Sequence, residues 1–413
     1  MSTNFNDYKP NYLKIEALGT NDSAINNMTI SFHCANYYPS VTLINDNPTL
    51  GNITGGGVYF TGSNVTISAT PNTNYTFVGW YDTLNNLVST ESSYTFAMPS
   101  NDVTYHAKFT TLSKGATTQF GTYPQSKVTD ATLISTLNTA AGTLPTSGNN
   151  RAWTDYGYYV NSNVSSYMWY IDVPNSGNLY RGVYFTGYRP FSTSYSSSSG
   201  DSSQDEHGYY KNETYWFKYE PISWKVLDIA GGKAFLLADL AIDAQDYYHS
   251  KFPRDINGTT VYPNNYEHSH IRAWLNDTFY NTAFTTTEKI MIDTTNVDNS
   301  VSSTGYDPNP YVCDSTNDKV FLLSYSEVTN TNYGFDAYQL STDINRKKSP
   351  SDYALSQGVN RIADSNSSYY WLRSPHSGNY ENARRVRADG MAAAYNIVTA
   401  ASYGVVPALW IIL

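Results

Sequence analysis

Two hydrophobic segments that enclose a polar one, near the carboxyl end, most constrain how this chain can fold. Residues 371–375 (WLRSP) and 407–413 (PALWIIL) are mostly apolar, whereas residues 376–403 carry His, Asn and Tyr and a cluster of Arg. Burying one aromatic or large aliphatic side chain stabilises a fold by roughly 1.5–3 kcal/mol. The flanks are therefore expected to be core strands, and the polar segment is expected to be displayed on that rigid base.

Residues 40–110 carry the pattern of a small all-β module. Apolar and polar residues alternate in 41–46 (VTLIND) and 65–70 (VTISAT), as they do in half-buried strands. The Gly-rich stretch 55–64 supplies turns on both sides of a short strand. Residues 1–39 form a lead segment with two strand candidates, at 12–18 and 28–34.

Residues 115–413 predict a larger α+β domain. Capped, amphipathic patterns predict helices over 130–142, 268–284 and 349–358, with Asp130 and Ser269 as N-caps. Apolar runs on either side of Gly231 and Gly232 predict a hairpin. The stretch 320–328 (VFLLSYSEV) is expected to be a strand, and the Ser-rich stretch 192–208 a loop.

Composition excludes several classes of function. The chain has 413 residues with a formal net charge of −10, which argues against a general nucleic-acid binder. No apolar run is long enough for a transmembrane helix. Charged residues are only 15 % while Tyr occurs 39 times, and abundant Tyr with Asn, Ser and Gly is typical of binding surfaces. A β-rich secreted protein is the alternative, because Tyr and Thr also favour strands.

The all-β module resembles the divergent internalin-type B-repeat of bacterial surface proteins. The resemblance rests on these residues: Val65-Thr66-Ile67, Pro71-Asn72, Tyr75, Phe77 to Asp82, Tyr94-Thr95-Phe96, Met98-Pro99, Asn101-Asp102-Val103 and Ala107-Lys108-Phe109. It implies a β-rich spacer that holds another domain away from a cell. One copy is visible.

The larger domain resembles a family of bacterial surface domains that is itself similar to the C-type-lectin-like fold. The resemblance rests on these residues: Phe120-Gly121, Tyr123 to Ser126, Pro221 to Leu227, Ser269, Ile271-Arg272, Trp274 to Asn276, Phe279-Tyr280, Ala283-Phe284, Leu322 to Ser324, Trp371 to Pro375, Gly404-Val405 and Pro407 to Trp410. Val406 departs from the Arg that relatives carry. The fold branch includes formylglycine-generating enzymes and the variable proteins of diversity-generating retroelements, which implies that 376–403 is a variable segment.

The candidate ligand-binding residues all lie in this segment. They are His376, Ser377, Asn379, Tyr380, Glu381, Asn382, Arg384, Arg385, Arg387, Tyr395, Asn396 and Thr399. Arg and Tyr most often anchor interfaces, so this set predicts a binding face for a ligand with acidic or aromatic groups. The alternative is a solvated hairpin whose Arg side chains pair with nearby carboxylates.

We therefore expect a bacterial ligand-binding protein, secreted or at the cell surface, although residues 1–19 carry no secretory signal pattern. Its ligand would be a protein or carbohydrate, on another cell or a phage. No metal, cofactor or catalytic residue is expected, and neither Cys34 nor Cys313 lies in a CxxC motif. The alternatives are a self-assembling structural protein and an enzyme related to formylglycine-generating oxidases.

Overall fold

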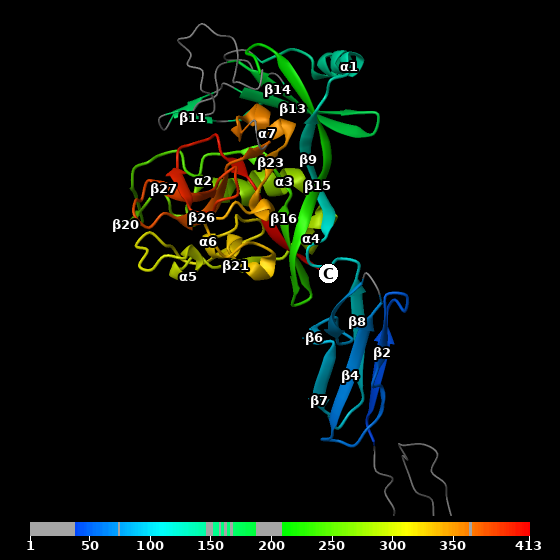
Figure 1. Cartoon of the computed structure of the whole chain (residues 1–413). Coiled ribbons are helices and arrows are strands. Elements are labelled where there is room, and N and C mark those ends of the chain that lie inside the picture. The colour runs from blue at the N-terminus through cyan, green and yellow to red at the C-terminus, as the bar shows by residue number, and fades with distance from the viewer. Residues whose placement is uncertain are drawn as a thin grey trace, which may run out of the picture. The chain divides into compact units, whose positions relative to one another are not determined.

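The computed structural model describes residues 38–72, 75–145, 152–156, 158–160, 163–165, 168–186, 209–362 and 366–413 (Figure 1). The chain divides into two compact units, one that ends at Phe109 and one that begins at Thr110. The two strand candidates of the lead segment, Cys34 and the whole 192–208 loop lie outside the described residues.

The first unit is built from two sheets. Its strands are β1 Ser40–Asn45, β2 Gly51–Thr54, β3 Gly57–Val58, β4 Asn64–Pro71, β5 Thr76–Tyr81, β6 Leu87–Ser89, β7 Ser93–Ala97 and β8 Val103–Thr110. One sheet has the order β3-β1-β8-β5-β6 and the other β2-β4-β7. Alternate residues of β4 are buried, and they pack with Trp80 in one core. The predicted all-β module is confirmed.

The second unit is organised around a long sheet. Its strands are β9 Thr117–Lys127, β10 Thr154–Asp155, β13 Met168–Asn175, β14 Asn178–Phe185, β15 Thr214–Ala230, β16 Lys233–Ala238 and β30 Ala408–Ile412. The order is β10-β13-β14-β15-β16-β30, and β9 also pairs with β15. The predicted hairpin is confirmed, because β15 turns into β16 through Gly231 and Gly232, which both have positive φ.

A second sheet carries the candidate segment. It has the order β18-β29-β26-β27-β28. Its strands are β18 Asp243–Ala244, β26 Tyr370–Pro375, β27 Asn382–Val386, β28 Ala394–Ile397 and β29 Gly404–Val405. The remaining strands form two-stranded pairs: β11 Tyr158–Val160 with β12 Asn163–Ser165, β17 Leu240–Ala241 with β23 Ser349–Pro350, β19 Arg254–Ile256 with β20 Thr259–Val261, β21 Thr295–Val297 with β22 Thr316–Asp318, and β24 Arg361–Ile362 with β25 Ser367–Ser368.

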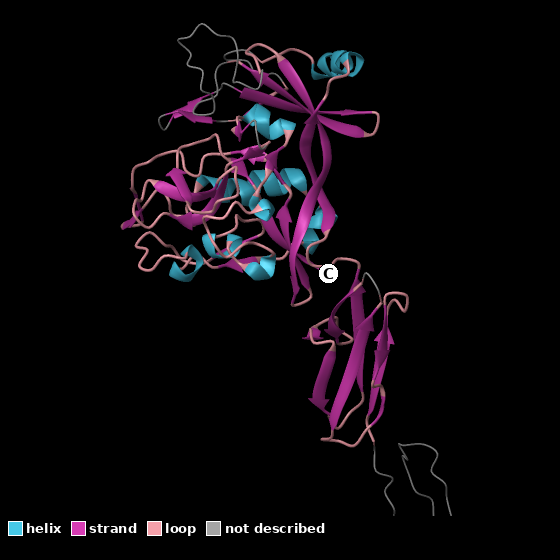
Figure 2. Cartoon of the chain, viewed as in Figure 1, coloured by secondary structure: helices cyan, strands magenta, loops and turns pink. Residues whose placement is uncertain are grey.

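The helices are short, and strands make up most of the regular structure (Figure 2). They are α1 Ala131–Ala141, α2 His270–Trp274, α3 Tyr280–Ala283, α4 Thr286–Met291, α5 Val301–Thr304, α6 Tyr325–Val328 and α7 Asp352–Gln357, with a π-helical turn η2 at Leu275–Phe279 and 3₁₀ turns η3 at Thr331–Tyr333 and η4 at Ile344–Arg346. The larger domain was predicted to be α+β, and it does contain both helices and strands, but the described chain is mostly β with few helices. In the described residues, no helix combines the length and the apolar character that crossing a membrane requires.

Local sequence signals account for most helix ends. The side chains of Asp130 and Ser269 cap α1 and α2, as predicted. The prediction of a strand over 320–328 is wrong. Phe321 forms one bridge to Ala408, and then Ser324 and Glu327 form a reciprocal capping box that starts α6.

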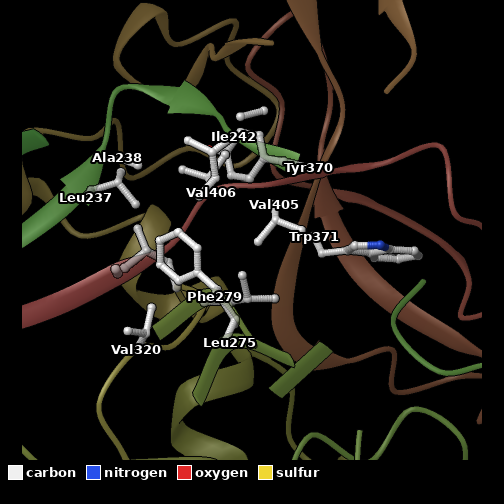
Figure 3. Close-up of a cluster of buried hydrophobic side chains, with 14 of the residues drawn as sticks. Leu237, Ala238, Ile242, Leu275, Phe279, Val320, Tyr370, Trp371, Val405 and Val406 are labelled. Carbon is white, nitrogen blue, oxygen red and sulfur yellow. The ribbon is translucent and has the colours of Figure 1, made fainter. Parts of the chain in front are cut away.

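The hydrophobic flanks lie in the core of the second unit, as predicted. Every residue of β26 is buried. Tyr370 and Trp371 lie in one cluster with Leu275, Phe279 and Val405 (Figure 3). The end of the second flank is less enclosed, because Ile412 is exposed at the end of β30.

Candidate functional site

The strand β26 holds the base of the candidate site by buried polar contacts as well as by packing. The indole Nε1 of Trp371 donates to the carbonyl of Gln245 at 3.0 Å. The buried guanidinium of Arg373 pairs with Glu327 and donates to the carbonyl of Leu322 at 2.7 Å. These contacts tie β26 to segments far away in the sequence, so the residues that follow it start from a fixed position.

The loop between β26 and β27 is closed by hydrogen bonds at its ends. The amide of His376 donates to the carbonyl of Asn382 at 3.0 Å. The buried Asn264 reaches the loop from outside, and its Nδ2 donates to the carbonyls of Asn379 at 3.3 Å and Asn382 at 3.0 Å. Asn264 thus holds the middle and the carboxyl end of the loop, and the bond from His376 to Asn382 joins the two ends to each other.

Aromatic side chains gather around this loop. The rings of His376 and Tyr395 lie 3.8 Å apart between centroids. The ring of Tyr380 lies 5.5 Å from that of Tyr262 and 6.2 Å from that of Tyr311. Tyr395 is 47 % exposed and Tyr380 is half-buried. The loop therefore offers rigid, partly exposed aromatic area, which costs little side-chain entropy when a ligand covers it.

The register of β27 and β28 separates the candidate residues into two groups. Arg384 lies opposite Tyr395, whereas Arg385 lies opposite Ala394 and Ala383 opposite Asn396. Side chains of directly opposed residues share a face, and neighbours along a strand point to opposite faces. Arg384 and Tyr395 are therefore on one side, and Arg385 and Asn396 are on the other. One continuous binding face made of all twelve residues does not form.

We name the accessible residues on the Tyr395 side, without the buried Arg384, the loop face. It consists of the outer loop residues with Tyr395 and the neighbouring tyrosines: His376, Ser377, Asn379, Tyr380, Glu381, Tyr395, Tyr262 and Tyr311. Asn382 stands at its inner end, where its carbonyl accepts the bonds that close the loop.

Arg384 was expected to be an exposed contact residue, but the structure shows that it is buried. It is only 3 % exposed, because its guanidinium carbon lies 4.0 Å from the ring centre of Tyr306 and 5.3 Å from that of Tyr325. Within the described part of the chain it forms no ion pair, and its buried Nε has no acceptor. Arg384 is thus a buried cation held by aromatic rings behind the loop face.

The second group packs against other aromatic residues. The Arg385 guanidinium carbon lies 4.3 Å from the ring centre of Tyr369 and 4.9 Å from that of Tyr403. Its Nε donates to the carbonyl of Tyr395 at 3.3 Å. The amide of Asn396 bonds to the Tyr403 hydroxyl. The alternative of a hairpin whose Arg side chains pair with carboxylates fits neither Arg385 nor Arg384.

The remaining candidates lie at the margins. Arg387 is exposed, and its Nη2 lies 2.9 Å from Oδ2 of Asp389. For this Arg, the alternative of a side chain paired with a nearby carboxylate is correct. Thr399 is half-buried and follows β28.

The imidazole of His376 in the loop face is affected by its partial burial. Burial, and secondarily the nearby charge of Arg384, lower the pKa of His376 below its ordinary value, so its ring is neutral at pH 7. The neutral ring stacks on Tyr395 without bringing a second cation next to Arg384. This leaves Arg384 as the fixed positive charge behind the loop face.

The described residues contain no cluster of His, Cys, Asp and Glu that could hold a metal ion. Burial raises the pKa of the Cys313 thiol to about 11, so at neutral pH it is almost entirely the unreactive thiol. Cys34, the other cysteine of the chain, lies outside the described residues.

Sequence reasoning missed the residues that come to the site from elsewhere. Tyr262 and Tyr311 lie beside Tyr380, and Tyr306 and Tyr325 hold Arg384. Asn264 fixes the loop. The high Tyr content was the one signal that pointed to them, and it does not say which Tyr residues converge.

The fold and site thus define a mostly β protein with an N-terminal β module and an aromatic loop face on its second unit. Residues 41–113 match the family model of the divergent InlB B-repeat domain, which confirms that resemblance. Residues 231–413 match the model of a domain of unknown function, DUF6273. No curated protein and no solved structure matches the chain. InlB B-repeats are typical of bacterial surface proteins.

Proposed function

We propose that this chain is a bacterial surface or secreted protein that binds a ligand, a protein or a carbohydrate, through the loop face. The observation that carries the proposal is the group of aromatic side chains around a loop that the buried Asn264 holds at its middle and at its carboxyl end. Partly exposed Tyr and His rings on a rigid base provide contact area. The unpaired charge of Arg384 behind them favours a ligand that carries acidic groups near its aromatic or sugar rings.

The test begins with the labelled full-length chain on arrays of carbohydrates and of bacterial and phage surface proteins. The ligand found there is then titrated against Tyr380→Ala and Tyr395→Ala. Each variant is expected to weaken binding about tenfold or more, with the melting temperature nearly unchanged. Arg385→Ala, on the other side of β27, is the matched control and should bind like the parent protein.

Three results would contradict the proposal. One is that no probe of either array binds, and another is that both Tyr variants bind as tightly as the parent chain. The third is that both Tyr variants unfold, because the two rings would then be core residues and not contact residues. Large assemblies in size-exclusion chromatography, with no ligand found, would favour the self-assembling structural protein.

The C-type-lectin-like fold and the retroelement origin of the variable segment are part of the same proposal. In the structure, Ala383, Val386, Ala388, Ala392 and Val398 of segment 376–403 are buried, as is Arg384. Diversification that preserves the fold would therefore spare these codons. A reverse-transcriptase gene nearby, with a near-copy of the DNA for 376–403 that differs at adenines of the loop-face codons, is the expected genomic finding. Differences concentrated in the buried codons would contradict it.

A further inference from the structure

A pocket of about 370 Å³ lies in the second unit. It is bounded by β15 and β16 on one side and by the turns η3 and η4 on the other. Its volume is within the range of about 300–1,000 Å³ that is usual for small-ligand sites. None of its lining residues belongs to 376–403.

The residues that line this pocket carry a large excess of positive charge. They include four lysines, Lys114, Lys225, Lys347 and Lys348, and a single carboxylate, Asp239. The whole chain has a formal net charge of −10, so this concentration of cations runs against the overall composition. Like charges brought together in a concave site raise each other's energy unless an anion joins them.

Internal carboxylates compensate only half of this charge. Lys348 lies 3.7 Å from Asp239, whose other oxygen accepts a bond from Ser223 at 2.8 Å. Lys114 lies 3.6 Å from Asp228. Among the described residues, Lys225 and Lys347 form no ion pair. Two of the four lysines that line the pocket therefore have no carboxylate partner.

The positions of the lysines are built into the fold. Lys225 is a β15 residue and lies opposite Leu237 of β16, so both side chains are on one face of the sheet. Lys348 is 5 % exposed, and its backbone carbonyl accepts a bond from the amide of Ser368 at 2.8 Å. Lysines are rarely buried to this degree unless they are paired, and Lys348 has Asp239 as its partner.

Apart from Asn345 and two glycines, the rest of the lining is apolar or aromatic. Leu227, Leu237 and Phe335 are buried beneath it, so its accessible apolar surface comes from the half-buried Tyr333 and from Ile344, which is 71 % exposed. A bare inorganic anion would leave this surface wet. A molecule with an apolar or sugar-ring body would cover it and bring its charged end to the lysines.

We propose that this pocket is a second ligand site, which binds a compact molecule that carries a carboxylate, sulfate or phosphate group on a ring-sized body. The anion pairs with Lys225 and Lys347, and Lys348 at the buried end supplies a third ammonium group. The body lies on Tyr333 and Ile344. This site does not depend on the loop face, and either can fail without the other.

The test uses the full-length chain and three probes of similar size, namely glucuronate, glucose 6-phosphate and uncharged glucose, measured by calorimetry or NMR titration. The charged probes are expected to bind at least about tenfold more tightly than glucose at low salt. Raising the salt from about 50 mM to about 300 mM should weaken them, because the ammonium groups reach solvent.

Lys225→Gln and Lys347→Gln remove the two unpaired charges without breaking an internal ion pair. Each is expected to weaken the charged probes about fivefold to tenfold and to leave glucose unaffected. Lys251→Gln is the control, because Lys251 is exposed and outside the pocket. Circular dichroism checks that each variant is folded.

The proposal is overturned if the charged probes bind no more tightly than glucose, or if none binds at about 10 mM. It is also overturned if the folded double variant Lys225→Gln/Lys347→Gln binds like the parent chain, since the anion would then sit elsewhere. NMR shifts confined to the loop face on addition of the charged probes would also show that the anion binds elsewhere, and would overturn the proposal.

Discussion

Two buried arginines of the second unit differ in how their charge is compensated. Arg373 pairs with Glu327 and donates to backbone carbonyls, whereas Arg384 lies between aromatic rings with no acceptor for its Nε. Removing one partner of a buried ion pair is strongly destabilising, but removing an uncompensated charge relieves its desolvation cost. The two arginines should therefore respond in opposite ways to the same substitution.

We expect Arg373→Met to lower the free energy of unfolding by about 3 kcal/mol or more. Arg384→Met should leave it unchanged or raise it by about 1 kcal/mol, since the apolar side chain still packs on Tyr306. Urea denaturation followed by fluorescence measures both. A loss of more than about 2 kcal/mol for Arg384→Met would show that the guanidinium makes stabilising contacts.

The buried Lys348 gives the stability a specific pH dependence. Burial, against the opposing attraction of Asp239, lowers the pKa of Lys348 from 10.5 to about 8. Between these values the unfolded chain binds more protons at this residue than the folded chain does, so stability rises with pH across this window. Below pH 8 both states are protonated and the cost of burying the charge is fully present.

We expect the wild type to gain roughly 2–3 kcal/mol relative to Lys348→Met between pH 7 and pH 10. The difference between the two proteins isolates this residue, because Tyr and Cys groups titrate in both. Urea denaturation at each pH measures it. Parallel curves would mean that Lys348 titrates with an ordinary pKa in the folded chain.

At the scale of single elements, α1 shows what a capping residue contributes. The Asp130 carboxylate accepts a hydrogen bond from the amide of Leu133 at 2.8 Å, and Leu137 fixes the helix to its core. We expect Asp130→Ala to cost about 1 kcal/mol of unfolding free energy and Asp130→Ser to cost much less, because Ser retains the cap. Equal losses in the two variants, measured by thermal unfolding, would contradict a capping role.

Elements with local signals were predictable from sequence, and the exceptions have local causes. Asp130, Ser269 and the Gly231 turn each announce a boundary within a few residues. The run 320–323 reads as a strand because it is apolar, but the capping box of Ser324 and Glu327 ends that pattern after one bridge.

The candidate site was less predictable than the elements that carry it. The anchoring flanks followed from hydrophobicity, and β26 is buried throughout. The side on which Arg384 and Arg385 fall depends on the register with β28, which sequence pattern does not fix inside an Arg-rich strand. The approach of Tyr262 to Tyr380 depends on tertiary packing across a long sequence separation.

At the scale of the whole molecule, the two units have separate hydrophobic cores. The core of the first contains Val65, Ile67 and Trp80, whereas the main core of the second is built from β15, β16, β26 and β30. The units meet in sequence between Phe109 and Thr110. A unit with its own core unfolds as a cooperative block, so calorimetry should resolve two transitions.

The transition of the first unit can be identified by a cavity in its core. Trp80 is fully buried, and Trp80→Ala should lower the stability of that unit by about 3–5 kcal/mol. The midpoint temperature of the first unit's transition should then fall by several degrees, or that transition should disappear. The transition of the second unit should keep its midpoint temperature. Trp371→Ala, in β26, is the reciprocal variant and should lower the second transition alone. If either variant shifts both transitions by similar amounts, the two units unfold as one cooperative block, and the first unit would be a stabilising part of the second and not an independent module.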